Sequence, residues 1–298
     1  MPDFSASEAH ICRLFPANTR FVYNGDNYSV VYSGKPRPSR GECKTDVYIL
    51  AKKDNGENRV FKISVKQTNA DFLENKMSLE RAMEIFGANA QSIISKSILT
   101  IKDAFEQDNM VCFQRYGRTE AKTIKLGWKF ELLWVESGDK SGLMSLSETQ
   151  KLDVLAGIHL GNDKKNCFVN NHCLTDSGVA DYILVVNPEN LPKTANECMS
   201  AIQDIREYAS KVDIYFACKA LNYRAVPNKW DGDRPLSVYV DWNIVNEKLT
   251  PTIVYSDPLG KRGNEVGDKL LACLQALHIN ASNFNSLKDY LAEGTKFY

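Results

Sequence analysis

The alternation of apolar and polar positions predicts β-hairpins in the first quarter of the chain. Residues 20–34 place aromatic and β-branched residues on both sides of an Asn-Gly pair, and residues 45–67 repeat that pattern around a second Asn-Gly pair. Asparagine and glycine supply the positive backbone angles that a two-residue hairpin turn needs. Helical spacing and a serine cap predict a helix over residues 5–15, ahead of both hairpins.

After residue 67 the apolar residues recur at helical spacing in several segments, with strand-like runs between them. Helices are predicted over residues 72–87, 145–161, 194–212 and 263–279, and in part of 89–106. Strands are predicted over residues 109–117, 179–188, 213–225 and 235–245. Residues 123–135 are compatible with either a strand pair or a helix.

These elements predict an α+β fold with a mixed central β-sheet flanked by helices, followed by additional strands and helices toward the C-terminus. Residues 1–110 are interpreted as the core, and residues 111–298 as the remainder of the α/β body. With 298 residues and no low-complexity linker, a single domain is equally consistent with the pattern.

The composition limits the classes of function. Lysine plus arginine and aspartate plus glutamate number 37 each, so the formal net charge is zero, which argues against a generally basic protein that coats nucleic acid. No apolar stretch reaches the roughly 18 residues that a membrane span needs, and no secretory signal is visible at the start. The eight cysteines form no CxxC pair, which favours reduced thiols in a cytoplasmic protein.

A set of polar side chains stands out in the second predicted hairpin. Asp46 opens its first strand, and Ser64 and Lys66 lie two residues apart near the end of its second strand. Side chains alternate along a strand, so Ser64 and Lys66 share one face while Ile63 and Val65 point to the other. Residues on one face of adjacent strands lie within reach of one another. The pattern predicts that an acid and an ammonium group meet at one site.

This arrangement resembles the restriction-endonuclease-like nucleases of the PD-(D/E)xK superfamily. The resemblance covers about residues 40–90: an aspartate on one hairpin strand, an xK pair on the next, and then a helix. It implies a restriction-endonuclease-like core and a Mg²⁺-dependent endonuclease that hydrolyses DNA phosphodiester bonds. In that chemistry Asp46 holds the metal, and Lys66 orients or helps deprotonate the attacking water. Gln67, next to the lysine, is a further candidate catalytic residue that could bind water or phosphate.

The chain departs from the family pattern at one position. The family has glutamate or aspartate two residues before the lysine, whereas this chain has Ser64, which we keep among the candidate catalytic residues because of its motif position. A second acid is then needed to hold the metal. Glu42, in the loop before the aspartate, and Glu8, on the first helix, are the candidates. Glu80 and Glu84 on the following helix are alternatives.

A nuclease without net charge needs its cations gathered where the phosphates lie. The loop over residues 34–44 leads into the hairpin and carries the first set of candidate DNA-binding residues: Lys35, Arg37, Arg40 and Lys44. The loop over residues 222–234 combines arginine with asparagine, which can bind base edges, and its candidates are Arg224, Lys229 and Arg234. Residues 115–129 form a third basic stretch with aromatic residues between the cations. Each of these segments is equally consistent with a solvated charged surface.

The leading hypothesis is a restriction-type, Mg²⁺-dependent deoxyribonuclease acting on double-stranded DNA, without a membrane partner. Two-fold symmetric DNA also makes a homodimer plausible. The serine in the motif favours a second hypothesis, a catalytically inactive, nuclease-derived protein that binds DNA. The third is a structural or interaction protein of viral or mobile-element origin. The motifs GxxxxGK[ST], GxGxxG, HExxH and GxSxG of other enzyme classes do not occur in the sequence.

Overall fold

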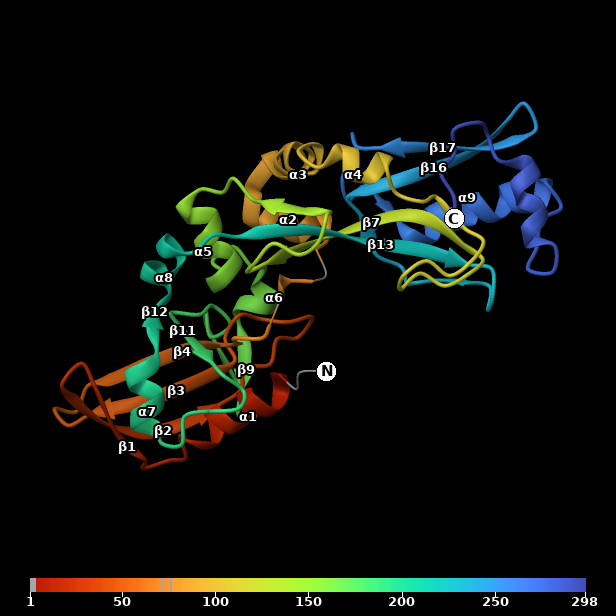
Figure 1. The fold of residues 1–298 in the computed structure, drawn as a ribbon. Helices are drawn as coiled ribbons and strands as arrows, with labels where there is room; N and C mark the ends of the chain where they lie inside the picture. The colour runs from red at the N-terminus through yellow and green to blue at the C-terminus, as the bar shows by residue number, and fades with distance from the viewer. Residues whose placement is uncertain (1–3, 71, 76) are drawn as a thin grey trace. The chain divides into compact units, whose positions relative to one another are not determined.

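The computed structural model describes residues 4–70, 72–75 and 77–298, and the chain divides into two units (Figure 1). The first unit is Met1–Asp71 together with Leu146–Asp213, and the second is Phe72–Ser145 together with Ile214–Tyr298. Each unit is therefore assembled from two separate stretches of sequence. Both contain helices and strands, which confirms the α+β fold class.

The first unit is organised around a six-stranded sheet and a two-stranded hairpin. Its described elements are α1 (Phe4–Arg13), β1 (Arg20–Tyr23), β2 (Asp26–Gly34), β3 (Val47–Lys53), β4 (Asn58–Gln67), α5 (Glu148–Ala156), α6 (Asn162–Lys165), β9 (Cys167–Val169), β10 (His172–Leu174), β11 (Tyr182–Val186), α7 (Ala195–Ala201), β12 (Gln203–Asp204) and α8 (Ile205–Lys211).

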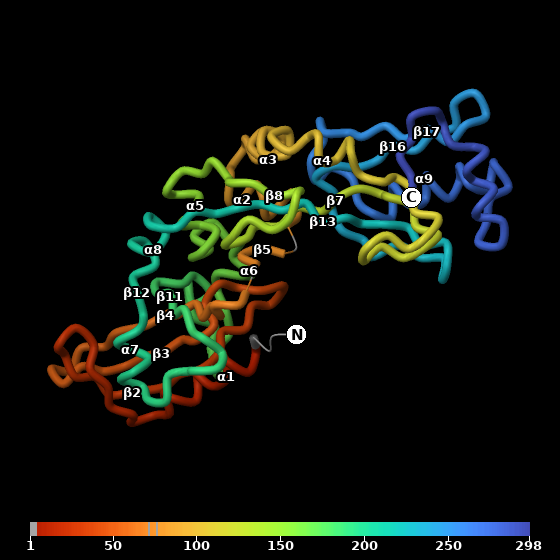
Figure 2. The backbone as a smooth tube through the Cα atoms, viewed as in Figure 1, coloured from red at the N-terminus to blue at the C-terminus, as the bar shows by residue number. Residues whose placement is uncertain are grey.

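The six strands follow the order β1-β2-β3-β4-β11-β12, and Figure 2 shows β2, β3, β4 and β11 next to one another. β1 to β4 form an antiparallel meander, and Asn24 (φ 50°) and Gly25 (φ 81°) make its first turn, as the Asn-Gly pair predicted. β11 runs parallel to β4. A parallel neighbour requires a crossover, and between β4 and β11 the chain passes through the second unit and α5. The sheet is therefore mixed, as expected.

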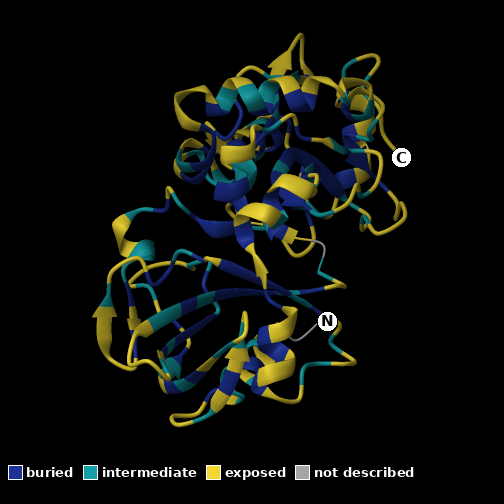
Figure 3. Ribbon diagram, turned by 90° about the vertical axis from the view of Figure 1, so that its left-hand side faces the viewer, coloured by how far each residue is buried: buried dark blue, intermediate teal, exposed yellow. Residues whose placement is uncertain are grey.

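Helices α1 and α7 contribute to a core that covers one face of this sheet. Ile11 of α1 and Phe15, which follows the helix, are fully buried in one cluster with alternate residues of β4, namely Phe61, Ile63 and Val65. Figure 3 draws long parts of these central strands as buried. Burial of each large apolar side chain contributes about 1.5–3 kcal/mol. The cluster thereby determines which residues of β4 face α1 and which face the opposite side.

The second unit is built on a larger sheet in which β14, β13, β7, β16 and β17 are neighbours and β5, β6 and β8 join β7 or β13. Its described elements are β5 (Phe72–Glu74), α2 (Leu79–Phe86), a 3₁₀ turn (Gly87–Asn89), α3 (Ala90–Leu99), α4 (Lys102–Glu106), β6 (Val111–Cys112), β7 (Thr123–Leu133), β8 (Ser141–Leu143), β13 (Tyr215–Arg224), β14 (Lys229–Trp230), β15 (Pro235–Leu236), β16 (Val238–Val245), β17 (Lys248–Val254), β18 (Lys261–Arg262), α9 (Gly263–Ala276) and a second 3₁₀ segment (Phe284–Tyr290).

The single helix predicted over residues 194–212 is wrong, because the chain forms two short helices, α7 and α8. Gln203 and Asp204 between them pair with β11 as the edge strand β12. The Asp204 side chain then accepts hydrogen bonds from the backbone N–H groups of Arg206 and Glu207 and begins α8. Sheet pairing and an aspartate cap therefore override a pattern that reads as one continuous helix.

The helix predicted over residues 72–87 begins later than expected. Its first residues form β5 beside β7, and α2 starts after Ser78, whose hydroxyl accepts a hydrogen bond from the backbone N–H of Arg81. Residues 72–106, which the sequence analysis included in a core ending at residue 110, belong to the second unit by their contacts. The region left open as strand pair or helix is one long strand, β7. None of the described helices combines the length and apolarity that a membrane crossing requires.

Candidate functional site

The candidate site lies where β3 begins and β4 continues past it. Val47, the first residue of β3, pairs with Ile63 of β4, and β4 then runs on to Gln67 beside β11. Asp46 donates its backbone N–H to the carbonyl oxygen of Ile63 (2.9 Å). Its carboxylate oxygen Oδ2 accepts a hydrogen bond from the backbone N–H of Val65 (2.7 Å). Because β3 begins at Val47, it does not pair with Val65 of β4. The Asp46 carboxylate accepts the hydrogen bond of Val65 instead.

Ser64 and Lys66 extend from β4 on the side of Asp46. The Ser64 side chain is fully buried, and its hydroxyl lies 3.4 Å from Asp46 Oδ2, which is the length of a weak hydrogen bond. Lys66 is half-buried, and its ammonium charge acts on the Asp46 carboxylate. The structure thus brings together the three residues that the strand alternation grouped.

The electrostatics of Asp46 distinguish it from an ordinary surface acid. Burial raises the pKa of its carboxyl group to about 6. The nearby Lys66 ammonium and the Val65 N–H oppose this rise, while the negative charge of Glu8 adds to it. At pH 7 the group is mostly ionised, in an environment that does not fully stabilise its charge. A carboxylate in this state favours the approach of a cation.

Helix α1 brings Glu8 to the same end of the sheet. Glu8 forms an ion pair with Lys35, which follows directly after β2, through its Oε2 and the Lys35 Nζ. The Glu8 side chain is 16% exposed and that of Lys35 is 51% exposed. Burial acts to lower the pKa of Lys35, but Glu8 and the charge of Asp46 raise it above its ordinary value. The charges of Glu8, Lys35 and Lys66 therefore all act on the Asp46 carboxylate.

Among the acids considered as a second metal ligand, Glu8 has a charge that acts on Asp46. Glu42 is exposed on the loop before β3. Glu80 and Glu84 lie on α2 in the second unit, where Glu84 forms an ion pair with Arg81 (3.1 Å).

Gln67 lies on the opposite side of β4 from Lys66, because consecutive residues of a strand alternate. It is buried, and its amide Nε2 donates a hydrogen bond to the hydroxyl of Ser7 on α1 (2.7 Å). This contact joins α1 to the end of β4, directly after the lysine. Gln67 therefore positions the helix that carries Glu8. Sequence spacing did not identify Ser7, since its partner is 60 residues away.

The first set of predicted DNA-binding cations lies on a loop that the first unit holds in place. Arg37 exchanges backbone hydrogen bonds with Phe168 of β9 (2.9 and 2.8 Å), and the Lys44 N–H donates to the carbonyl oxygen of Gly178 (2.9 Å). Arg37 and Arg40 are exposed, while Lys44 is half-buried. The loop begins next to the Asp46 site, because Lys35 is part of both.

The second set of predicted DNA-binding cations belongs to the other unit. The Arg224 guanidinium forms ion pairs with Glu120 (2.8 Å) and Asp231 (2.7 Å), so its charge is already balanced. Lys229 and Arg234 are exposed. The two sets therefore differ: the first begins with Lys35 beside the Asp46 site, and the second lies in the other unit.

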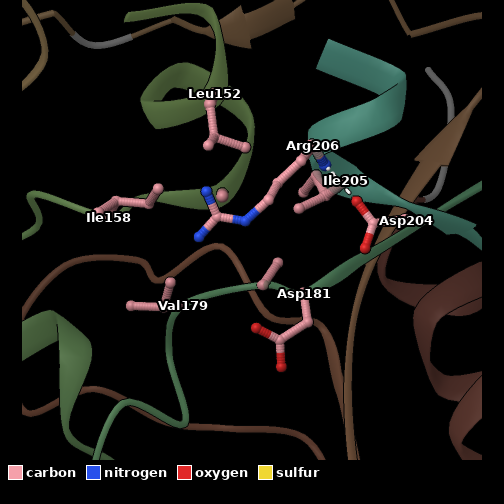
Figure 4. A pocket seen from close by; sticks show the side chains of 9 residues that line it. Leu152, Ile158, Val179, Asp181, Asp204, Ile205 and Arg206 are labelled. Carbon is pink, nitrogen blue, oxygen red and sulfur yellow. Dashed lines mark hydrogen bonds between the residues drawn. The ribbon is translucent and has the colours of Figure 1, made fainter. Parts of the chain in front are cut away.

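A pocket of about 240 Å³ lies elsewhere in the first unit (Figure 4). Arg206 extends over it toward Leu152 and Ile158, and Asp181 lies on its other side. Asp181 forms an ion pair with Lys62 (3.3 Å). The pocket is smaller than the roughly 300 Å³ at which small-molecule sites begin, so we assign no ligand to it. Its lining residues are Leu152, Ala156, Ile158, Val179, Ala180, Asp181, Asp204, Ile205 and Arg206.

Within the described residues, no group of three or more histidine, cysteine, aspartate or glutamate side chains is arranged to hold a metal ion. Asp46 and Glu8 are two carboxylates, and further ligands at such a site would be water or backbone oxygen atoms. Searches with this chain find no matching family model, no matching curated protein and no matching solved structure.

Proposed function

We propose that the chain is a Mg²⁺-dependent, restriction-type deoxyribonuclease whose reacting groups are Asp46, Glu8 and Lys66. The observation that carries the proposal is the interaction of two carboxylates and an ammonium group at the end of β4. The resemblance to the PD-(D/E)xK nucleases supports the same residues, since it expects an acid on one strand and an xK pair on the next within a mixed sheet flanked by helices. Here Asp46 directly precedes β3, and Ser64 and Lys66 lie on β4.

The two carboxylates suit Mg²⁺, which is commonly bound by one or two carboxylates and keeps several water molecules. The repulsion of Glu8 contributes to the raised pKa of Asp46, and a divalent cation between the two acids would relieve it. Glu8 would supply the second acid that the family pattern has at the position of Ser64. When bound, Mg²⁺ neutralises phosphate charge and lowers the pKa of its bound water.

The remaining groups orient the Asp46 carboxylate and the attacking water, and they stabilise the negative charge of the phosphate. The N–H of Val65 and the hydroxyl of Ser64 hold the Asp46 carboxylate in one orientation. The Lys66 ammonium orients the attacking water and stabilises the negative charge that develops on the phosphate. Lys35, whose side chain is half exposed, can move from Glu8 to a phosphate of the substrate.

Double-stranded DNA is the substrate in this proposal, and the exposed arginines Arg37 and Arg40 would bind its backbone. A homodimer would present two such sites to the two strands of symmetric DNA. One observation favours a second candidate function: the motif position that usually carries an acid is Ser64, fully buried beside Asp46. Under that alternative the chain binds DNA without cutting it.

Cleavage of supercoiled plasmid DNA with Mg²⁺ or with EDTA distinguishes these functions. We expect Mg²⁺-dependent nicking that falls at least 100-fold in Asp46→Ala and in Lys66→Ala, because each removes a group that acts on the reacting phosphate. Lys52→Ala, an exposed lysine on the neighbouring strand, is the matched control and should cut normally. Retardation of DNA in a gel without cleavage would support the inactive DNA-binding protein. Absence of both would rule out both functions.

A further inference from the structure

The second unit has an exposed group of aromatic side chains that plays no part in the proposed Asp46 site. Tyr116, Phe297 and Tyr298 expose 51%, 47% and 50% of their surface, although large aromatic side chains are usually buried. The rings of Tyr116 and Tyr298 have centroids 4.6 Å apart, and Phe297 packs edge-on against Phe113 at 5.5 Å. We call the three exposed residues the aromatic platform. Tyr116 and Tyr298 form one exposed ring pair, and the neighbouring residue Phe297 exposes its ring beside Phe113. Exposed apolar groups of this kind mark interaction sites.

Backbone hydrogen bonds hold the platform in place. The N–H of Met110 donates to the carbonyl oxygen of Lys296 (2.8 Å), and the N–H of Tyr298 donates to that of Val111 (2.9 Å). The N–H of Phe113 in turn donates to the carbonyl oxygen of Tyr298 (2.7 Å). The last described residues thus lie along residues 110–113 as an added strand. A ligand that stacks on the rings would meet a surface that is already ordered, so little entropy is lost on binding.

Three exposed cations lie beside residues of the platform. Residues 110–119 contain Arg115 and Arg118 and no acidic residue, and both arginines are exposed. The Lys288 ammonium lies 4.9 Å from the ring centroid of Phe113 and 6.0 Å from that of Phe297. Exposed aromatic rings between positive charges are the combination that binds single-stranded nucleic acid, because bases stack on rings while phosphates meet cations. A purely apolar partner would not require the cations.

We infer that the aromatic platform, with Arg115, Arg118 and Lys288, is a binding site for single-stranded DNA. Unpaired bases stack on the ring pair of Tyr116 and Tyr298 and on the exposed ring of Phe297, and the two arginines bind the phosphates. The bases of a duplex are already stacked on one another, so duplex DNA binds this surface only through its phosphates. The inference does not depend on cleavage at Asp46, because the platform belongs to the other unit.

Fluorescence anisotropy with a labelled 12-nucleotide DNA of mixed sequence, in EDTA so that nothing is cut, tests this inference. The same sequence as a duplex serves as the reference: in the proposed function Arg37 and Arg40 of the other unit also bind duplex DNA, so Tyr116→Ala should leave duplex binding unchanged. Tyr116→Ala should weaken single-strand binding about 5-fold to 100-fold, the range that loss of one stacked base gives. Tyr116→Phe should bind like the wild type, since the ring stacks without its hydroxyl. Phe72→Ala, an exposed aromatic residue on β5, is the control and should also bind normally.

A second measurement separates stacking from charge. Arg115→Gln with Arg118→Gln should reduce the slope of log K against log salt by about 1.4, which corresponds to two phosphate contacts on a single strand. Because Tyr116 lies in an exposed turn, its alanine variant should keep the thermal transition of the wild type. Equal weakening of single-strand and duplex binding by Tyr116→Ala, or unchanged single-strand binding by a folded Tyr116→Ala, would overturn the inference. So would a change from dimer to monomer on Tyr116→Ala in light scattering, because the platform would then be a contact between copies of the chain.

Discussion

Replacing Asp46 by asparagine should abolish cleavage and at the same time stabilise the metal-free protein at neutral pH. The asparagine oxygen can still accept the hydrogen bond from the Val65 N–H, so the local geometry is kept while the charge is removed. The pKa of Asp46 is raised from 3.8 to about 6, chiefly by burial. At about 1.36 kcal/mol per pH unit, keeping this group ionised in the folded state costs up to about 3 kcal/mol.

The sign follows from proton binding. Between pH 3.8 and about 6 the folded state holds the Asp46 proton and the unfolded state has lost it, so stability falls as the pH rises through this window. Below the window the acid is neutral in both states and resembles asparagine. The difference in unfolding free energy between Asp46→Asn and the wild type should therefore be small at pH 4 and reach about 3 kcal/mol in favour of the variant at pH 7.

The assay is urea unfolding of both proteins in EDTA from pH 4 to pH 8. Asp54→Asn is the matched control, because Asp54 is an exposed acid in the turn between β3 and β4 and its surface ion pair with Arg20 contributes little. It should differ from the wild type by less than about 0.5 kcal/mol at every pH. If Asp46→Asn were less stable than the wild type at pH 7, the carboxylate would be well stabilised as an ion. The argument that it attracts a cation would then fail.

Three further substitutions test the contacts that hold each unit. Gly178→Ala would place its Cβ 2.0 Å from a backbone carbonyl oxygen and 2.8 Å from a buried sulfur. The free energy of unfolding in urea should therefore fall by at least about 1–3 kcal/mol, and wild-type stability would refute that packing. Ser7→Ala removes the buried acceptor of the Gln67 amide, so we expect a loss of about 1–2 kcal/mol in the same assay; an unchanged unfolding midpoint would mean that α1 is not held by this bond. Arg81→Met leaves two carboxylates of the second unit without their guanidinium, so calorimetry should show a loss of about 3–5 kcal/mol at pH 7, and a neutral result would contradict a structural ion-pair network there.

Much of the site could be predicted from local chemistry. Asn24 and Gly25 form the turn of the first hairpin, and Asn55 and Gly56 lie in the longer turn of the second. Alternation then assigns Ser64 and Lys66 to one face of β4. The same alternation places Gln67 on the face of β4 that α1 covers, so the side on which Gln67 meets α1 could also be predicted. The prediction of one helix over 194–212 was wrong because Gln203 and Asp204 pair with β11. The spacing of apolar residues within a segment contains no information about pairing with a distant strand.

The chain's local pattern was enough to establish the turns, the faces of β3 and β4, and the pairing of an acid with a lysine, because these depend on backbone geometry over a few residues. The folded arrangement had to supply the rest: which acid stands beside Asp46, how residues 113–116 meet the last aromatic residues, and how two sequence stretches build each unit. These depend on contacts between segments far apart in the chain. Such contacts form when apolar surfaces are buried together, and no short window of sequence contains both partners.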